Sequence, residues 1–388
     1  MMDTFLVYAS SLIIVGSPLW FYGGIIYLFR KWRHYRQLAA LAKDTAIINC
    51  STSHNYVTCS GESSQERSEK QQSPFSCQRE IQQHSSDYEK YHRLAKRYCA
   101  ALIAIIVFSI WGPHRSRKIG EFLGARRWRL WDAWLNYVGY TVLHDKGNME
   151  QDQEQQQQDE MATPILAFVP HGIFPFALAF SCLPQRGYEE TWGIFRPVVA
   201  TATKLFPLVR TFIAWMGGID ASRSAVSSAL TQSDNVVGLA PGGIAEMFET
   251  YPKPGFHRND EAFRVRNGIF KLALKNNRPI VPIFCFGATK MFRRIQLPAF
   301  IENLSRLLKI SLCLFFGKFG LPLPFRQRLM YVMGKAIYPP LLNNEESDEL
   351  LLDQQAQDMH DRFCDEIIRI FDRNKEHYGW GNKTIRLV

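Results

Sequence analysis

The sequence predicts an α/β protein, with a mixed, mostly parallel sheet flanked by helices behind an N-terminal membrane-anchoring helical region. Short apolar stretches typical of strands occur at residues 165–169, 236–239 and 280–286, and apolar helical stretches such as Gly268–Lys275 lie between them. The stretch 347–375 has a strong helical period and should close the domain as one or two helices. A chain of 388 residues with 46% hydrophobic content is large enough to bury a core.

Residues 1–29 are predicted to form a transmembrane helix. The run Thr4–Phe29 carries no charge, and its roughly 26 residues would reach about 39 Å, enough to cross a hydrocarbon core of about 30 Å. A cleaved signal peptide is the alternative, but it would have a basic start, a shorter apolar run and a small-residue cleavage site. The basic residues Arg30, Lys31 and Arg33 follow the run and predict that this end lies in the cytosol.

Residues 30–97 are rich in Ser, Gln, Glu and Lys without a lasting apolar period, which predicts a polar, disordered insert. Residues 98–112 form a second apolar segment that is short for a full span. A membrane hairpin or re-entrant helix, a tilted short span and a buried core helix all remain open for this segment. Residues 113–388 are predicted to form the main folded domain, in which the glutamine-rich residues 146–160 form a disordered loop.

Two further segments allow either a membrane-facing or a core position. Tryptophans and arginines recur at helical spacing over residues 126–138, which suits a helix at the lipid headgroup level or one packed on the core. The apolar residues 307–325, interrupted by lysines and glycines, suit a membrane-dipping surface or a buried hairpin.

The formal net charge of +10 favours an anionic partner, which could be nucleic acid, an acidic membrane surface or a phosphorylated small molecule. The basic residues cluster beside apolar or tryptophan-bearing segments and form no recognised nucleic-acid motif, so membrane lipids and a phosphorylated substrate are expected instead of nucleic acid. The eight cysteines form no CxxC pair, which predicts neither a zinc site nor a dense disulfide framework.

His171 is the candidate general base. It follows the predicted strand 165–169 and Pro170 and precedes Gly172, at the strand end where ligands gather in open α/β sheets. A neutral imidazole there can take a proton from an alcohol while nearby backbone amides face an oxyanion. A lone histidine more often only satisfies a turn, so the assignment depends on the other loops.

The second loop follows the predicted strand 236–239. Its adjacent glycines, Gly242 and Gly243, allow close approach of a ligand, and their amides are candidate oxyanion donors. Glu246 is the candidate catalytic partner that holds His171 in one tautomer or stabilises its charged form. A glycine pair alone is more often only a turn.

A third block places cations ahead of a helix N-terminus, an arrangement that can bind phosphate, although a solvated basic face has the same pattern. The candidate phosphate-binding residues are Arg223, Arg264, Arg266, Asn267 and Gly268.

Together these motifs resemble the type-2 diacylglycerol acyltransferase family from about Ala125 to the C-terminus, apart from the glutamine-rich insert. One departure is Val169, which stands where the family usually has the first histidine of its His-Pro-His-Gly motif. The aspartate five positions after the histidine in related glycerophosphate acyltransferases is replaced here by Phe176. The segments that carry the resemblance are Pro170–Gly172, Gly217–Ile219 with Ser222 and Arg223, Pro241–Gly243 with Glu246, Arg266 with Gly268–Leu274, Val281–Gly287, and the tail His377–Gly379 with Lys383.

The resemblance implies a glycerolipid-acyltransferase-like fold and an enzyme of the endoplasmic reticulum membrane whose catalytic domain faces the cytosol, with lipid droplets as a second location. Such an enzyme moves a fatty acyl group from acyl-CoA to diacylglycerol, giving triacylglycerol, with His171 matching the family's active-site histidine and Glu246 the acidic residue after its glycine pair. Acyl-CoA is the expected co-substrate, and neither another cofactor nor a metal is expected.

Several alternatives remain open. Monoacylglycerol or a long-chain alcohol could replace diacylglycerol as acceptor, and the change at Val169 would also suit a non-catalytic membrane or lipid-droplet scaffold. A serine lipase is excluded because the sequence has no G-x-S-x-G motif. The chain could also form a homo-oligomer.

Overall fold

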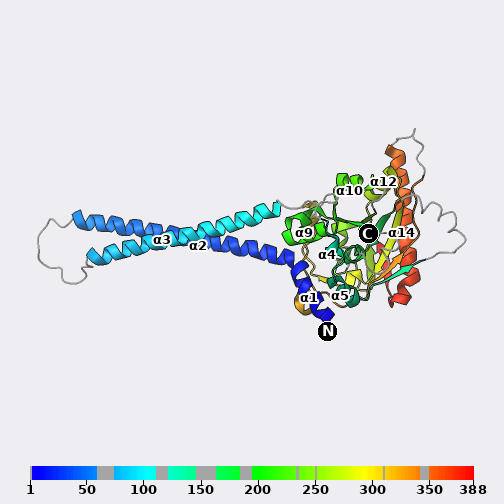
Figure 1. Ribbon diagram of the computed structural model, residues 1–388, viewed down its shortest axis with the longest axis horizontal. Helices are drawn as coiled ribbons and strands as arrows, with labels where there is room; N and C mark the ends of the chain where they lie inside the picture. Colours follow the sequence, from blue (N-terminus) through cyan, green and yellow to red (C-terminus); the bar gives the residue numbers. More distant parts are fainter. Residues whose placement is uncertain are drawn as a thin grey trace. The chain divides into compact units, whose positions relative to one another are not determined.

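The computed structural model describes most of the chain as two compact units (Figure 1), one formed by residues 1–17 with 112–388 and the other by residues 18–111. The described residues are 2–58, 74–110, 121–145, 163–183, 195–232, 236–249, 251–308, 311–340 and 349–388. The predicted glutamine-rich loop 146–160 lies outside these residues.

The larger unit is built on a seven-stranded sheet in the order β1-β10-β7-β2-β5-β3-β4. Neighbouring strands are parallel except for β10 and β7, which run antiparallel, so the prediction of a mixed, mostly parallel sheet is confirmed. The strands are β1 (Thr141–His144), β2 (Ile165–Val169), β3 (Arg196–Val199), β4 (Ile219–Asp220), β5 (Val237–Leu239), β7 (Ile280–Phe286) and β10 (Met330–Met333).

Helices cover both faces of this sheet, because alternate side chains of the buried strands point to opposite sides. In β2, Leu166 and Phe168 join one core, whereas Ile165, Ala167 and Val169 join the other. The first core is covered by α1 (Met2–Ile14), α5 (Leu130–Tyr137), α7 (Phe176–Ser181) and α9 (Pro207–Trp215), and the second by α10 (Arg223–Leu230), α12 (Gly268–Lys275) and α14 (Glu349–Tyr378).

The predicted C-terminal helical stretch is the single helix α14, which lies along one flank of the sheet (Figure 1). Four of its apolar side chains, Met359, Phe363, Ile367 and Phe371, are fully buried. The predicted helix Gly268–Lys275 is also confirmed as α12, which packs against α14.

Short elements complete the unit. They are α4 (Leu123–Arg126), η2 (Thr201–Leu205), α11 (Gly243–Glu246), β6 (Asp260–Phe263), η3 (Ala288–Lys290), β8 (Arg293–Arg294), α13 (Ala299–Leu308), β9 (Phe315–Phe316), η4 (Lys318–Gly320) and β11 (Thr384–Leu387). Among them, strands β6 and β11 form a parallel pair, and β8 and β9 form an antiparallel pair.

The N-terminal apolar run differs from the single helix predicted over residues 1–29. Helix α1 ends at Ile14 and a second helix, α2, begins at Ser17. Helix α1 packs within the larger unit through both apolar and polar side chains. Val7 is fully buried in the core, Ser11 Oγ donates to the Pro322 carbonyl (2.6 Å) and Trp134 Nε1 donates to Ser10 Oγ (2.9 Å). Among the described residues, no single helix is both long and apolar enough for a membrane span, although the broken pair Met2–Ile14 and Ser17–Thr45 meets both conditions together.

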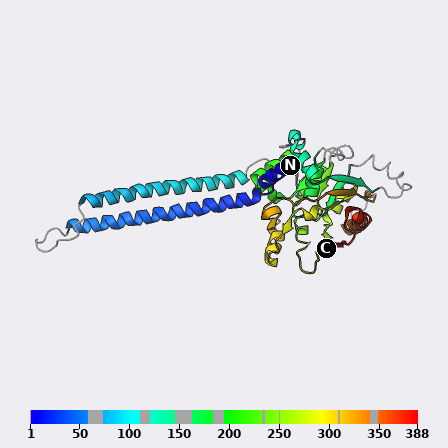
Figure 2. The same cartoon turned by 90° about the horizontal axis from the view of Figure 1, so that it is seen from below.

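The smaller unit is a hairpin of the long helices α2 (Ser17–Thr58) and α3 (Pro74–Ile110), which run side by side in opposite directions (Figures 1 and 2). Helices therefore occupy the described parts of the segment 30–97, where the sequence predicted disorder. Small and aromatic side chains hold them together: Ala39 and Ala95 are buried, and Tyr35 stacks on Tyr98 with ring centres 5.5 Å apart. On each helix these contact residues lie three or four positions apart, as in a coiled coil. Because they are few among many polar residues, the helical period is hard to detect in the sequence.

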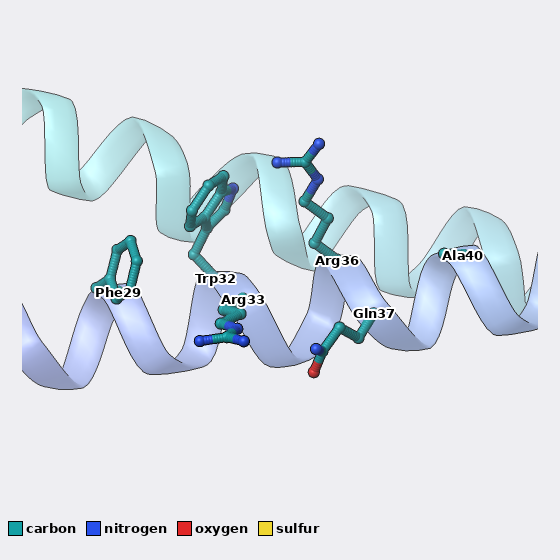
Figure 3. A pocket seen from close by; sticks show the side chains of 6 residues that line it. All are labelled: Phe29, Trp32, Arg33, Arg36, Gln37 and Ala40. Carbon is teal, nitrogen blue, oxygen red and sulfur yellow. The ribbon is translucent and has the colours of Figure 1, made fainter.

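The hairpin carries a hollow of about 400 Å³ on α2 (Figure 3). Trp32 and Arg36 lie on the side of α2 that faces α3, and the guanidinium of Arg36 sits 5.5 Å from the centre of the Trp32 ring. None of its lining residues belongs to the predicted site. They are Phe29, Trp32, Arg33, Arg36, Gln37 and Ala40.

Candidate active site

His171 lies directly beyond β2, at the edge of the sheet where the parallel strands end. The strands on either side of β2 are β5 and β7, and neighbouring strands lie about 4.8 Å apart. The loops that follow β5 and β7 therefore flank His171. These are the glycine loop, residues 240–246, and the turn at Gly287, so the structure brings together the three loops that the sequence singles out.

Gly172 fixes the turn that carries the histidine. Its φ is +67°, and a Cβ atom at this position would lie 3.1 Å from the carbonyl oxygen of Ala288, in the turn after β7. A larger residue would be strained and would press against that backbone. Glycine at this position therefore lets the histidine turn contact the neighbouring loop.

The tautomer of His171 follows from its hydrogen bond. Its Nδ1 atom lies 2.8 Å from the carbonyl oxygen of Gly172. Because a carbonyl only accepts, Nδ1 carries the proton and Nε2 is the basic nitrogen. Burial lowers the pKa of His171 below that of free imidazole, and the bond to Gly172 partly offsets this effect. The ring is therefore neutral, and able to accept a proton, near pH 7.

Glu246 lies in α11 and is almost fully buried. Within the described part of the chain, neither carboxyl oxygen makes a well-formed hydrogen bond, although the backbone amides of His171 and Arg264 approach the carboxyl and favour its ionised form. Burial outweighs these amides and raises the pKa of Glu246 to about 8. The carboxyl thus approaches the backbone of His171, and no hydrogen bond joins it to the imidazole ring.

Gly242 is required where it stands, because a Cβ atom there would collide with the Glu246 carboxyl and lie 2.6 Å from the Arg264 carbonyl oxygen. The candidate oxyanion donors Gly243 and Gly172 differ in what their amides can do. The Gly243 N–H donates to the Ala240 carbonyl (3.2 Å) and is committed to the turn. The Gly172 N–H donates to no acceptor within the described residues, which makes it the better candidate for an oxyanion donor.

A cluster of cations surrounds Glu249, three residues after Glu246. Its buried carboxylate is paired with Arg264 (3.3 Å), Arg306 (2.9 Å) and Lys253. Three cations against one anion leave a positive excess beside the glycine loop, where a phosphate could bind. The sequence analysis identified Arg264 but missed Arg306 and Lys253; no local signal marks Arg306, which reaches the cluster from α13.

The other predicted phosphate-binding residues are more dispersed. Arg266 and Gly268 are exposed at the start of α12, and the Asn267 side chain donates to Gln357 Oε1 of α14 (2.8 Å). Arg223 begins α10 after β4, at the same sheet edge as His171 but with β5 and β3 between them. The structure thus places Arg264 against the glycine loop and does not bring Arg223 into contact with His171.

A second buried carboxylate, also missed in the sequence, connects the C-terminal tail to the turn after β7. Glu261 in β6 accepts from Thr289 Oγ1 (2.7 Å) and pairs with Lys290 and Lys383 (2.6 Å each). The tail strand β11 pairs with β6 in parallel. These bonds hold the turn that contacts Gly172.

Val169 and Phe176 stand where related motifs have a histidine and an aspartate, and both of their side chains lie in the apolar core. Val169 is fully buried and pairs in register with Phe284 of β7. Phe176 is buried and stacks on Phe180 with ring centres 5.3 Å apart. Both side chains therefore belong to the core and supply no polar group to the imidazole.

Within the described residues, no group of three or more His, Cys, Asp and Glu side chains is arranged to hold a metal ion.

The chain was compared with known proteins. A family model described as diacylglycerol acyltransferase matches residues 95–388. Acyl-CoA wax alcohol acyltransferase 1 of Mus musculus is 24% identical over 279 residues, covering 68% of this chain and 78% of that protein. Diacylglycerol O-acyltransferase 2-like protein 6 of Homo sapiens is 26% identical, covering 66% and 75%. The 2-acylglycerol O-acyltransferase 1 of Mus musculus is 25% identical, covering 66% and 77%.

Among solved structures, the 1-acyl-sn-glycerophosphate acyltransferase of Thermotoga maritima covers 71% of this chain and 83% of that chain, with a TM-score of 0.30 and 12% sequence identity. A likeness this low carries no argument about fold or function.

Proposed function

Because the chain belongs to the diacylglycerol acyltransferase family and is an acyltransferase, we propose that it transfers a fatty acyl group from acyl-CoA to the free hydroxyl of diacylglycerol, with His171 as the general base. The observation that carries this proposal is the position of His171: a neutral imidazole at the carboxyl end of β2, between the glycine loop and the turn after β7.

The reaction needs no covalent enzyme intermediate. Nε2 of His171 takes the hydroxyl proton as the acceptor oxygen attacks the thioester carbonyl, and the Gly172 amide stabilises the oxyanion of the tetrahedral intermediate. Collapse of the intermediate breaks the carbon–sulfur bond, and the imidazolium returns its proton to the CoA thiolate. The products are the new ester and free CoA.

Glu246 is proposed as a positioning residue. Its carboxyl approaches the backbone amide of His171, so it holds the turn that presents the imidazole. A buried carboxyl whose pKa is about 8 is mostly protonated near neutral pH, so Glu246 acts through the backbone of this turn and not through a negative charge beside the imidazole.

The phosphates of acyl-CoA are proposed to bind at the basic cluster beside the glycine loop. Arg264 and Arg306 share the buried Glu249, which fixes their guanidinium groups close to the loop. Arg266, Asn267 and Gly268 continue this edge at the start of α12, and Arg223 lies further along it. Charge-assisted bonds from arginines suit phosphate groups.

A second candidate acceptor is favoured by a specific observation. The relatives include wax alcohol and 2-acylglycerol acyltransferases at nearly the same identity as the diacylglycerol acyltransferase-like protein. A long-chain alcohol or monoacylglycerol is therefore the alternative to diacylglycerol. All three acceptors present a hydroxyl to the same base, so His171 would act identically on each.

The hairpin is proposed to anchor the enzyme in the endoplasmic reticulum membrane, with the catalytic unit in the cytosol. Residues 17–29 and 98–110 are apolar and reach about 20 Å each along the helix. Several of their large side chains are exposed, among them Trp20, Ile103 and Phe108. Because Tyr35 stacks on Tyr98, basic residues of both helices, including Arg36 and Arg97, lie just beyond the apolar part, where headgroup phosphates would meet them.

The test is an assay of the purified full-length protein in vesicles with labelled acyl-CoA and each acceptor in turn. The expected product is labelled triacylglycerol from diacylglycerol. Faster formation of wax ester or diacylglycerol from the other acceptors would overturn the acceptor assignment. Absence of any labelled ester from all three would overturn the enzyme assignment and favour a scaffold that kept the fold without activity.

A further inference from the structure

Four large apolar side chains share the outer face of helix α13 in the larger unit. Phe300, Leu304, Leu307 and Leu308 are all exposed, and Leu307 reaches 78% exposure. At 100° per residue these four side chains lie within an arc of about 100° on one side of the helix. An arc of this width is typical of a helix face that is covered by something apolar.

The opposite side of α13 is firmly bound to the catalytic unit. Arg294 of β8 pairs with Glu302 (2.8 Å), and Ser305 is fully buried. Arg306 pairs with Glu249, whose N–H donates to the Glu246 carbonyl (3.0 Å). The polar face of α13 therefore packs against the catalytic unit, and the apolar face with the exposed leucines points away from it.

The apolar surface continues beyond α13. Ile295 and Leu314 are exposed neighbours joined by a backbone hydrogen bond (2.8 Å), and Phe319 is 84% exposed. The turn at Phe319 adjoins α1, because Ser11 bonds to Pro322 and the Lys318 ammonium lies 5.5 Å from the Tyr8 ring centre. The outer residues of α1, Met2 and Phe5, are exposed as well. Figures 1 and 2 both show α13, in orange, at the same end of the unit as α1.

The charges next to this surface match a lipid leaflet. Arg293 and Lys318 lie beside the apolar residues, whereas the acidic residue of α13, Glu302, is paired with Arg294. Cations at the border of an apolar face complement the phosphates of lipid headgroups. At ten residues α13 is about 15 Å long, too short to cross a bilayer, so it would lie in the plane of the interface.

We propose that the outer faces of α13 and α1, with the turn at Phe319 between them, form a docking surface that seats the catalytic unit on a membrane leaflet independently of the hairpin. The outer face of α13 lies one helix diameter, about 10 Å, from Glu249, which Arg306 on the inner face contacts. A leaflet seated on this face would hold lipid acceptors close to the glycine loop. This last step rests on the proposed function, whereas the docking itself does not.

The test is photo-cross-linking of the full-length protein in vesicles of phosphatidylcholine and phosphatidylserine that contain labelled phosphatidylcholine. The photoreactive residue p-benzoylphenylalanine replaces Leu307 in one variant and Phe319 in a second. Leu350 is the matched control, because it is 72% exposed on α14 and lies outside the proposed surface. The expected result is on the order of tenfold more labelled lipid on the first two variants than on the control.

Equal labelling at the three positions would overturn the proposal. Cross-linking of one chain to another at Leu307, in place of lipid, would also overturn it and would identify an interface between copies. Circular dichroism checks that each variant is folded, and the second variant keeps the test decisive if the first is not. Because labelling needs no acyl transfer, its result stands apart from the acceptor assay.

Discussion

The side chains near His171 in the sequence give its ring no polar partner, because Val169 and Phe176 are both buried among apolar side chains. The ring is held instead by the backbone of the next residue. The Gly172 carbonyl sets its tautomer, and Glu246 approaches its backbone from the loop after β5. A histidine in the place of Val169 would therefore enter the core next to Phe284 and away from the reacting atoms.

The stability of the protein should depend on pH through Glu246. Burial raises its pKa to about 8 in the folded state, above the ordinary range of an unfolded glutamate. Because the folded-state pKa is raised, the protonated carboxyl contributes to the free energy of unfolding. This contribution is fully present below about pH 4.5 and is lost as the pH rises through about 8. The free energy of unfolding of the wild type should therefore fall between pH 5 and pH 8. For Glu246→Gln the fall should be smaller, by on the order of 1 kcal/mol or more.

Urea unfolding in detergent at the two pH values measures this difference. Glu349→Gln, at an exposed carboxyl of α14, is the matched control and should behave as the wild type does. A wild type and a Glu246→Gln variant with parallel pH profiles would show that Glu246 is ionised in the folded protein.

Sequence reasoning found the site residues that lie in local motifs and missed those brought in from a distance. The loops that carry His171 and Glu246 stand out because strands and glycines surround them. Arg306 and Lys290 have no such signal, since the partners that define their roles are far away in sequence. Arg126, in the segment left open between headgroups and core, is fully buried and donates to the Phe195 and Met216 carbonyls, and its neighbours Trp131 and Trp134 are buried too.

At the level of elements, length and burial decided what the sequence could predict. Strands β2 and β7 are apolar throughout, and β5 is flanked by recognisable turns, so all three were predicted close to their observed bounds. Strands β1, β3, β4 and β10 have two to four residues and give no measurable period. The helices of the hairpin were missed because their contacts use alanine and tyrosine within a polar composition.

The C-terminal helix α14 should be a major source of stability. Phe363 is fully buried and packs edge-on against Phe270 of α12, with ring centres 5.7 Å apart. Phe363→Ala would leave a cavity between the two helices and should lower the free energy of unfolding by about 3–5 kcal/mol. Leu350→Ala, at an exposed position of the same helix, should change it by less than about 0.5 kcal/mol. Chemical denaturation measures both, and similar losses for the two variants would contradict the assigned face of α14.

Among the residues that the structure describes, both the hairpin unit and the catalytic unit carry exposed apolar side chains. Large exposed apolar patches suit contact with lipid. The family model matches from residue 95, so it includes the end of α3 but not α1 and α2.

The hairpin anchor should be sensitive to charge in its apolar part. The double substitution Ile103→Lys and Ile106→Lys places two cations among exposed apolar side chains and should reduce the fraction of protein that floats with vesicles by several-fold, at a cost of about 2.5 kcal/mol per lysine at the bilayer centre and less near its surface. The matched control, Gln82→Lys with Gln83→Lys, adds the same charge in the polar part of α3. Equal flotation of the two variants would contradict membrane insertion of residues 98–110.

The central claim is that His171 is the base for acyl transfer, and the most direct test is the initial rate of labelled ester formation by His171→Ala. The expected rate is at least about 100-fold below that of the wild type, because general-base catalysis contributes on that scale. His144→Ala, at an exposed histidine of β1, should keep the wild-type rate, and melting temperatures should show that both variants are folded. Full activity of a folded His171→Ala variant would contradict the claim.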